Sequence, residues 1–140
     1  MEVKTDIEYN RPLPDMDGVS EVYWKGAAEG RLLIQRCTTC SKLQFYPRGL
    51  CIHCGGEPEW IEASGKGTVH TFTVIRQYHA SPFKEKLPYV VAIIELEEGV
   101  RMMGNITDCD VDAVRIGMGV EAYAVNVAEE GIAVPFWRLR

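Results

Sequence analysis

One stretch of this chain decides its fold. Residues 36–56 read Arg-Cys-Thr-Thr-Cys-Ser-Lys-Leu-Gln-Phe-Tyr-Pro-Arg-Gly-Leu-Cys-Ile-His-Cys-Gly-Gly, so that Cys37 pairs with Cys40 and Cys51 with Cys54 as two Cys-x-x-Cys motifs. In each motif the two intervening residues turn the backbone so that both thiolates point at one centre, and two motifs complete a tetrahedral sulfur shell. The spacing therefore predicts a four-cysteine metal site in a small ribbon, with zinc as the expected metal.

Other uses of these four cysteines fit the sequence less well. Two disulfides would need an oxidising compartment, and residues 1–15 carry four acidic side chains and no apolar run of the kind found in a secretory signal. A redox dithiol would need only one pair. Iron in the same sulfur shell remains an alternative to zinc, because thiolate ligation does not by itself separate the two metals.

A shell of four thiolates determines what the metal can do. Catalytic zinc keeps one coordination position for water or substrate, whereas four cysteines leave none. We therefore expect a structural metal and look for function elsewhere in the chain. His53, inside the second motif, is a further possible ligand that the four thiolates make unnecessary.

The overall composition is that of an ordinary globular protein. Of the 140 residues, 46% are hydrophobic and 25% are charged, which fits one domain or two small ones. No apolar run approaches the ~20 residues of a membrane-spanning helix. We expect a cytoplasmic protein that does not contact membranes.

Basic side chains gather in the middle of an acidic chain. The net charge is −5, yet residues 31–86 hold eight basic and four acidic side chains, against three and seven before them and four and nine after them. A local basic patch suits a small polyanionic ligand, whereas a nucleic-acid track is typically a long basic stripe on a protein of high pI. The alternative is that these side chains only solvate the ribbon.

Hydrophobic periodicity divides the chain into three parts. Pro12 and Pro14 predict an irregular leader over residues 1–16. Residues 17–63 are predicted to contain an N-terminal helix, which starts near Asp17 with Asp15 or Asp17 as its cap and stops at Gly30, followed by the ribbon.

Residues 64–140 are predicted to be β-structure. The fourth and fifth expected strands follow a long loop over residues 108–119, and five strands with this connection favour a small closed barrel of the OB type. The expected fold class is thus mainly β: a helix, a rubredoxin-like zinc ribbon and a C-terminal five-stranded OB-fold barrel. The expected strands are 68–79, 89–96, 100–106, 120–128 and 132–139.

The chain offers no convincing catalytic group. Cys109 is the only cysteine outside the two motifs, and the flanking Asp108 and Asp110 would raise its pKa and suppress the thiolate. His70 and His79 are nine positions apart, so on a regular strand they face opposite sides. We expect no catalytic residue in this chain.

Three aromatic residues are candidate partner contacts. Trp24 lies beside the apolar stripe of the expected helix. Phe136 and Trp137 are neighbours on the last expected strand, so one of them should face outward.

Several motifs together resemble one family. The chain is similar, over residues 17–139, to the zinc-ribbon and OB-fold proteins first catalogued as domain of unknown function 35. The motifs that carry the resemblance are Cys37-x-x-Cys40, Phe45-Tyr46-Pro47-Arg48, Cys51-x-x-Cys54-Gly55, Ser64-Gly65-x-Gly67-x-Val69, Pro88-Tyr89-Val90-Val91 and Ile116-Gly117-Met118-x-Val120.

The resemblance implies an accessory subunit. Members of this family bind acyl-CoA and pair with thiolase-like enzymes: thiolase with hydroxymethylglutaryl-CoA synthase, acyltransferases, and the aldolases of steroid side-chain degradation. In such assemblies the partner carries the catalytic residues. On this basis we expect a non-catalytic, acyl-CoA-binding scaffold in lipid or steroid metabolism.

The same resemblance gives the basic side chains a role. We expect those on or near the ribbon to meet the phosphates of CoA, with Arg48, held beside Pro47 between the two motifs, as the strongest candidate. Two alternatives belong to other classes: an OB module for single-stranded nucleic acid, which the acidic pI opposes, and a rubredoxin-like electron carrier, which requires iron. The candidate ligand-binding residues are Arg36, Lys42, Arg48 and Lys66.

Overall fold

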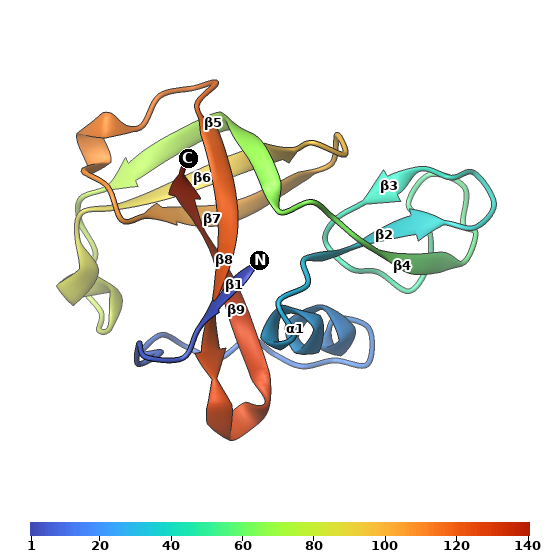
Figure 1. The fold of residues 1–140 in the computed structure, drawn as a ribbon, viewed down its shortest axis with the longest axis horizontal. Helices are drawn as coiled ribbons and strands as arrows, with labels where there is room; N and C mark the ends of the chain where they lie inside the picture. The colour runs from blue at the N-terminus through green and yellow to red at the C-terminus, as the bar shows by residue number, and fades with distance from the viewer.

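A small three-stranded ribbon and a β-barrel stand side by side, with one helix packed where they meet (Figure 1). The computed structural model describes all of residues 1–140. The mainly β fold with an N-terminal ribbon and a C-terminal OB-fold is as predicted. None of its helices combines the length and the apolar character that a bilayer crossing requires.

The ribbon is an antiparallel sheet in the order β3-β2-β4. Its strands are β2 (Leu33–Cys37), β3 (Leu43–Gln44) and β4 (Pro58–Glu62). Ten residues separate the two Cys-x-x-Cys motifs, a spacing that predicts one short hairpin over residues 43–50, but only Leu43–Gln44 form a strand. The remaining residues form a loop whose backbone groups bond to buried glutamine side chains instead of to a neighbouring strand.

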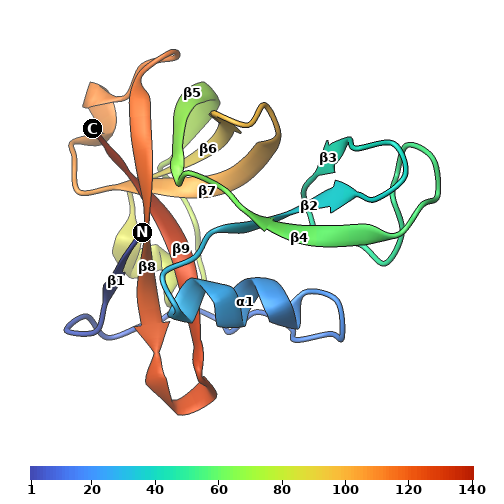
Figure 2. The same cartoon turned by 45° about the vertical axis from the view of Figure 1, so that its right-hand side comes forward.

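The helix α1 (Glu21–Ala28) packs against β2 and against the barrel (Figure 2). It starts four residues later than the position predicted, because the Asp17 carboxylate accepts the N–H groups of Val19 and Ser20 (3.0 and 2.6 Å) and holds a separate turn there. Gly26 lets the helix approach β2 closely, since a Cβ there would lie 2.5 Å from a Leu33 methyl carbon. Gly30, at φ +78°, ends the helical segment as expected.

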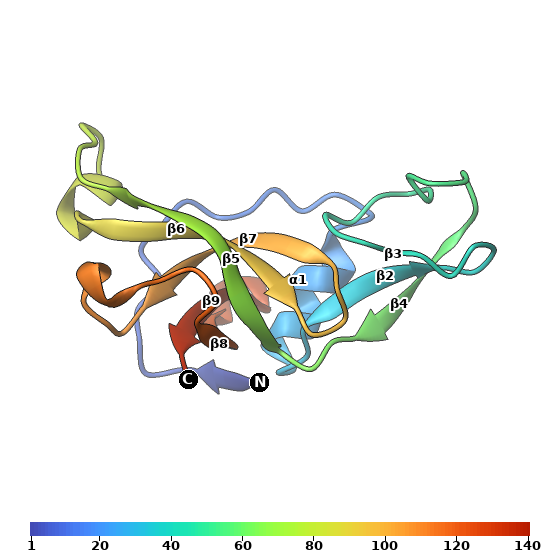
Figure 3. The ribbon, with the colours of Figure 1, turned by 90° about the horizontal axis from the view of Figure 1, so that it is seen from above.

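Five strands pair in a closed ring. Antiparallel pairings join β5 to β6, β6 to β7, β8 to β9 and β5 to β8, and the parallel pairing of β7 with β9 completes the circuit (Figure 3). The loop predicted over residues 108–119 contains one short 3-10 turn at Val111–Ala113. The strands are β5 (Lys66–Ile75), β6 (Tyr89–Leu96), β7 (Arg101–Thr107), β8 (Gly119–Val127) and β9 (Ile132–Leu139).

The barrel interior is the main core. Alternate residues of β6 point into it, as a strand with one buried face requires. Trp137 is the largest fully buried side chain, and Gly104 on the neighbouring strand β7 makes room for its indole ring.

The leader is not irregular throughout. Residues Glu2–Lys4 form a strand, β1, that pairs in parallel with residues 123–125 of β8. The edge of β8 is available there because β5 pairs with β8 only over residues 119–121. The prediction missed this strand because three residues are too few to show a period, whereas the prolines farther on suppressed regular structure only around themselves.

One residue of the pair Phe136 and Trp137 does face out of the barrel, as predicted, but neither is exposed to solvent or to a partner. Trp137 is 1% exposed inside the barrel, and Phe136 is 2% exposed on the opposite face of β9. There the Phe136 ring stacks with Tyr123 at 5.9 Å and lies under the Arg11 guanidinium at 4.5 Å. The N-terminal segment thus covers a face that the strand pattern alone assigns to solvent.

Replacing Gly104 by alanine tests the packing around the barrel tryptophan. The added Cβ would lie 2.5 Å from Trp137 Cδ1, and the fully buried ring has no space to withdraw. We expect the free energy of unfolding to fall by about 1–3 kcal/mol, as for other overpacked cores, measured by urea denaturation. Gly18→Ala is the matched control, since no atom lies within 4 Å of that Cβ; equal stability of the two variants would contradict the packing.

Candidate functional site

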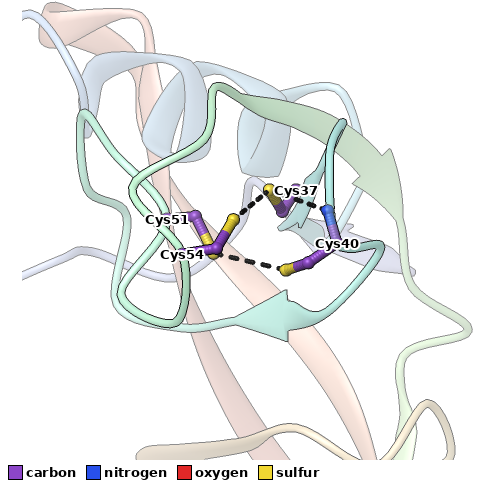
Figure 4. A group of neighbouring side chains, drawn as sticks. All are labelled: Cys37, Cys40, Cys51 and Cys54. Carbon is purple, nitrogen blue, oxygen red and sulfur yellow. Dashed lines mark hydrogen bonds between the residues drawn. The ribbon is translucent and has the colours of Figure 1, made fainter.

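The four cysteine sulfurs of the ribbon converge on one point. All four Sγ atoms lie within 4.8 Å of one another, with Cys37 and Cys54 3.5 Å apart and Cys40 and Cys51 3.7 Å apart (Figure 4). A tetrahedral site with Zn–S bonds of ~2.3 Å has sulfur–sulfur edges of about 3.8 Å. These cysteines form no disulfide, and the four sulfurs are positioned, as predicted, to bind a single metal ion.

The backbone of both motifs is shaped for thiolates. The N–H groups of Thr39 and Cys40 donate to Cys37 Sγ (3.3 and 3.4 Å), and the N–H of His53 donates to Cys51 Sγ (3.3 Å). Gly56 must be glycine, because a Cβ there would lie 2.8 Å from Cys37 Sγ. His53 itself is exposed and lies outside the sulfur cluster.

The thiols titrate unequally because they crowd one another. The donated N–H of Cys40 is the main cause that lowers the pKa of Cys37 to about 6. The pKa of Cys54 is raised to about 11: the N–H of Gly56 lowers it, but the neighbouring sulfurs together raise it further. A cation bound at the centre would offset this repulsion and hold all four groups as thiolates.

A groove of about 740 Å³ is the second candidate site. It lies where the barrel face of β6, β7 and β9 meets α1, the loop of the ribbon and the N-terminal segment. Its walls are mostly aromatic and apolar, and three arginines, Arg11, Arg48 and Arg101, line it. An apolar cavity with a few convergent cations can hold an elongated ligand that has an apolar part and an anionic part.

Two buried glutamines fix the groove's ribbon wall. Gln35 Oε1 accepts the N–H of Arg48 (2.9 Å) and the side-chain amide of Gln44 (2.7 Å), while Gln35 Nε2 donates to the Arg48 carbonyl (2.9 Å). Gln44 in turn accepts the N–H of Ile52 and donates to the carbonyl of Leu50. The backbone of Arg48 is therefore bonded on both sides to a side chain that is 3% exposed.

Comparisons with known proteins follow the same two-part division. The family model described as the ChsH2 rubredoxin-like zinc ribbon domain matches residues 24–59, and that of the ChsH2 C-terminal OB-fold domain matches residues 60–125. A DUF35 domain-containing scaffold protein of Methanocaldococcus jannaschii is 42% identical over 113 residues, which cover 77% of this chain and 78% of the relative. The chain belongs to the DUF35 family.

Other relatives of this DUF35 protein are longer. The 3-oxo-4,17-pregnadiene-20-carboxyl-CoA hydratase alpha subunit of Mycobacterium tuberculosis is 37% identical over 106 residues, which cover 74% of this chain and 33% of that subunit. A probable enoyl-CoA hydratase alpha subunit of Thermomonospora curvata is 36% identical over 111 residues, 79% of this chain and 34% of the relative. The chain therefore spans about one third of each hydratase subunit.

A solved structure is similar over nearly the whole fold. It is a chain of the "Ltp2-ChsH2(DUF35) aldolase", with a TM-score of 0.79 and 32% identity, and the match covers 91% of this chain and 98% of that chain.

The four predicted ligand-binding cations are not brought together. Arg48 alone lines the groove. Arg36 is exposed and bonded to Glu59 at 2.8 Å, and Lys42 lies at a separate shallow hollow beside His53. Lys66 is exposed at the start of β5, outside the groove.

Sequence reasoning missed two of the groove's arginines. Arg101 begins β7 and pairs with Glu95 at 3.2 Å, and Arg11 lies in the segment that was expected to be an irregular leader. Neither arginine lies in a recognisable sequence motif. Each becomes part of the groove only through the residues that surround it in the folded chain. Trp24, predicted as a partner contact, is half-buried and lines the same groove, and its role with a partner stays a prediction.

The titratable groups outside the metal site do not form a catalytic pair. Burial, and then the charges of Asp108 and Asp110, raise the pKa of Cys109. His70 and His79 are both exposed, on or just after β5. The arrangement of the chain can bind and orient a molecule, and we find no nucleophile held against a base.

Removing one sulfur ligand tests the metal site. We expect the wild-type protein to bind one metal ion per chain. We expect Cys40→Ser to lose that ion and to unfold the ribbon, because a structural metal such as zinc contributes about 10–16 kcal/mol of binding free energy in such small domains. Elemental analysis measures the metal, and distinguishes zinc from iron; NMR peak dispersion of the ribbon residues reports its order. Cys109→Ser is the control with a cysteine outside the site. Full metal content in Cys40→Ser would contradict the four-sulfur assignment.

Proposed function

We propose that this protein is a non-catalytic scaffolding subunit that binds acyl-CoA together with a thiolase-like enzyme. The observation that carries the proposal is the likeness to a chain of the Ltp2-ChsH2(DUF35) aldolase, which extends over 98% of that chain. The structural metal, which we propose to be zinc, would brace the ribbon and take no part in chemistry. Thiolate ligands persist in a reducing compartment, so we also propose a cytoplasmic location.

The groove supports the acyl-CoA part of the proposal. Acyl-CoA combines an anionic nucleotide end with a long, weakly polar pantetheine and acyl part. The groove offers arginines and a mainly apolar, aromatic wall in one continuous space of about 740 Å³. Arg48 makes no ion pair within the chain, so its guanidinium is available to a phosphate.

Two observations support the scaffold part of the proposal: the chain has no well-placed nucleophile, and its relatives carry the names of enzyme subunits. Cys109 is disfavoured as a nucleophile, since burial and two neighbouring aspartates raise its pKa. Relatives with hydratase names are about three times the length of the matched region. A partner subunit would accordingly supply the reacting groups, and a thiolase, hydroxymethylglutaryl-CoA synthase, acyltransferase or steroid side-chain aldolase would each fit this role.

Recovery of the assembly tests the proposal directly. The tagged protein is purified from its native host, the retained proteins are identified by mass spectrometry, and CoA esters are released and quantified. We expect one thiolase-like protein in stoichiometric amount together with acyl-CoA. Recovery of the chain alone without CoA, or with nucleic acid, would refute the scaffold assignment, the second result in favour of a nucleic-acid-binding OB module.

Charge reversal at Arg48 tests its proposed phosphate contact. We expect Arg48→Glu to weaken acyl-CoA binding at least tenfold, because a hydrogen bond to a charged group contributes about 1.5–3 kcal/mol, as measured by calorimetry on the purified assembly. Lys42→Glu is a matched control: it is also an exposed ribbon cation without an ion pair, but lies outside the groove. Unchanged affinity in Arg48→Glu would remove this residue from the site.

A further inference from the structure

Arg11 is the only basic residue of the groove that comes from the N-terminal segment. The segment that carries it leaves β1 and crosses from the barrel toward the ribbon before it reaches α1 (Figure 3). Its guanidinium carbon is 4.5 Å from the centre of the Phe136 ring, which is itself buried. The Arg11 side chain is therefore oriented by stacking and is half-buried.

Arg11 has no acidic partner within the chain. It makes no ion pair and donates no side-chain hydrogen bond, and the nearest titratable groups are the hydroxyl groups of Tyr9, Tyr89 and Tyr123, which are neutral at pH 7. Six other basic side chains that make no ion pair are exposed, where water solvates them; they are Lys42, Arg48, Lys66, Lys84, Arg115 and Arg140. A seventh, Lys86, is half-buried but donates to Asn10 Oδ1 at 2.6 Å. Arg11 alone combines partial burial with the absence of both an ion pair and a hydrogen-bond acceptor for its side chain.

A partly buried cation without a counter-ion is unfavourable unless a ligand supplies one. Removing charge from water costs free energy, and folded proteins offset that cost by pairing buried charges. Burial lowers the pKa of Arg11, in agreement with this unfavourable environment. The same groove contains a second donor without an acceptor, since Trp24 Nε1 is buried and makes no hydrogen bond. Because Trp24 Nε1 has almost no accessible surface, the half-buried Arg11 guanidinium is the donor that an oxygen-rich occupant of the groove would satisfy.

We propose that Arg11 is an oxyanion-binding residue of the groove. This inference rests on the proposed acyl-CoA function and adds a contact from a segment that precedes residues 24–125, the part matched by the family models. The planar guanidinium presents several N–H groups in a fixed fork that matches a phosphate or a carboxylate. Within an acyl-CoA these oxyanions are the phosphates of the nucleotide end or a carboxylate at the end of a dicarboxylic acyl group.

Calorimetry on the purified full-length protein compares wild type with Arg11→Met and Arg11→Lys. Methionine keeps an unbranched apolar chain over Phe136 and removes the charge, whereas lysine keeps the charge and loses the fork. We expect Arg11→Met to bind coenzyme A at least tenfold more weakly and Arg11→Lys to lie between it and wild type. Arg140→Met is the matched control, because Arg140 also lacks an ion pair but lies outside the groove, and thermal melting verifies that each variant is folded.

The choice of ligand separates the two sources of the oxyanion. A loss for coenzyme A in Arg11→Met, with no loss for pantetheine, assigns the contact to phosphate. A loss for glutaryl-CoA, with none for coenzyme A or butyryl-CoA, assigns it to an acyl carboxylate. Equal affinities of wild type and Arg11→Met for every ligand would overturn the role of Arg11 and leave the proposed function standing.

If the isolated chain binds no CoA compound, that result counts against ligand binding by this subunit alone. A direct probe of the Arg11 side chain then still tests the oxyanion role separately from the proposed function. The Nε–Hε NMR resonance of Arg11 is then followed during titration with inorganic pyrophosphate. A saturable shift of that resonance, with the Arg140 resonance unchanged, supports the oxyanion site. The absence of a shift overturns it.

Discussion

Four sulfur atoms within 4.8 Å of one another are the constraint on which the ribbon depends. The ribbon has three short strands, one of only two residues, and cannot bury a core of its own size. A metal ion at the sulfur centre would supply the missing free energy, because metal binding and folding are the same event in such small domains. Once the four cysteines are held together, the loop between the two motifs is held as well, and with it the groove wall that this loop forms.

The buried glutamines extend that order from the metal site to the groove. Gln44 bonds to Ile52, next to the ligand Cys51, and to Gln35, and Gln35 bonds to both sides of the Arg48 backbone. Each polar group of this network is satisfied inside the protein, which is what makes a buried polar network rigid rather than costly. Arg48 is thus positioned by a short chain of hydrogen bonds that begins beside the metal ligands, although its own side chain is exposed.

Much of this fold could be predicted because its signals are local. The cysteine spacing predicts the metal site, and the nearly continuous apolar runs of residues 89–96 and 132–139 predict β6 and β9, whose observed bounds equal those expected. What could not be predicted depends on contacts between distant segments. A strand pattern gives Phe136 an exposed face, and only the folded N-terminal segment covers it. Arg11 likewise becomes part of a site only through the ring on which it stacks, which lies 125 positions along the sequence.

The groove belongs to no single part of the molecule. The N-terminal segment, α1, the ribbon and the barrel each contribute a wall, so any occupant contacts all four at once. By mass action, a ligand that binds only this arrangement stabilises it by RT ln(1 + [L]/Kd). Ligand binding would therefore tighten the joint between ribbon and barrel without any reacting group in this chain. A scaffold requires this property, because it must bind a molecule in a fixed position and keep its own conformation while another subunit performs the chemistry.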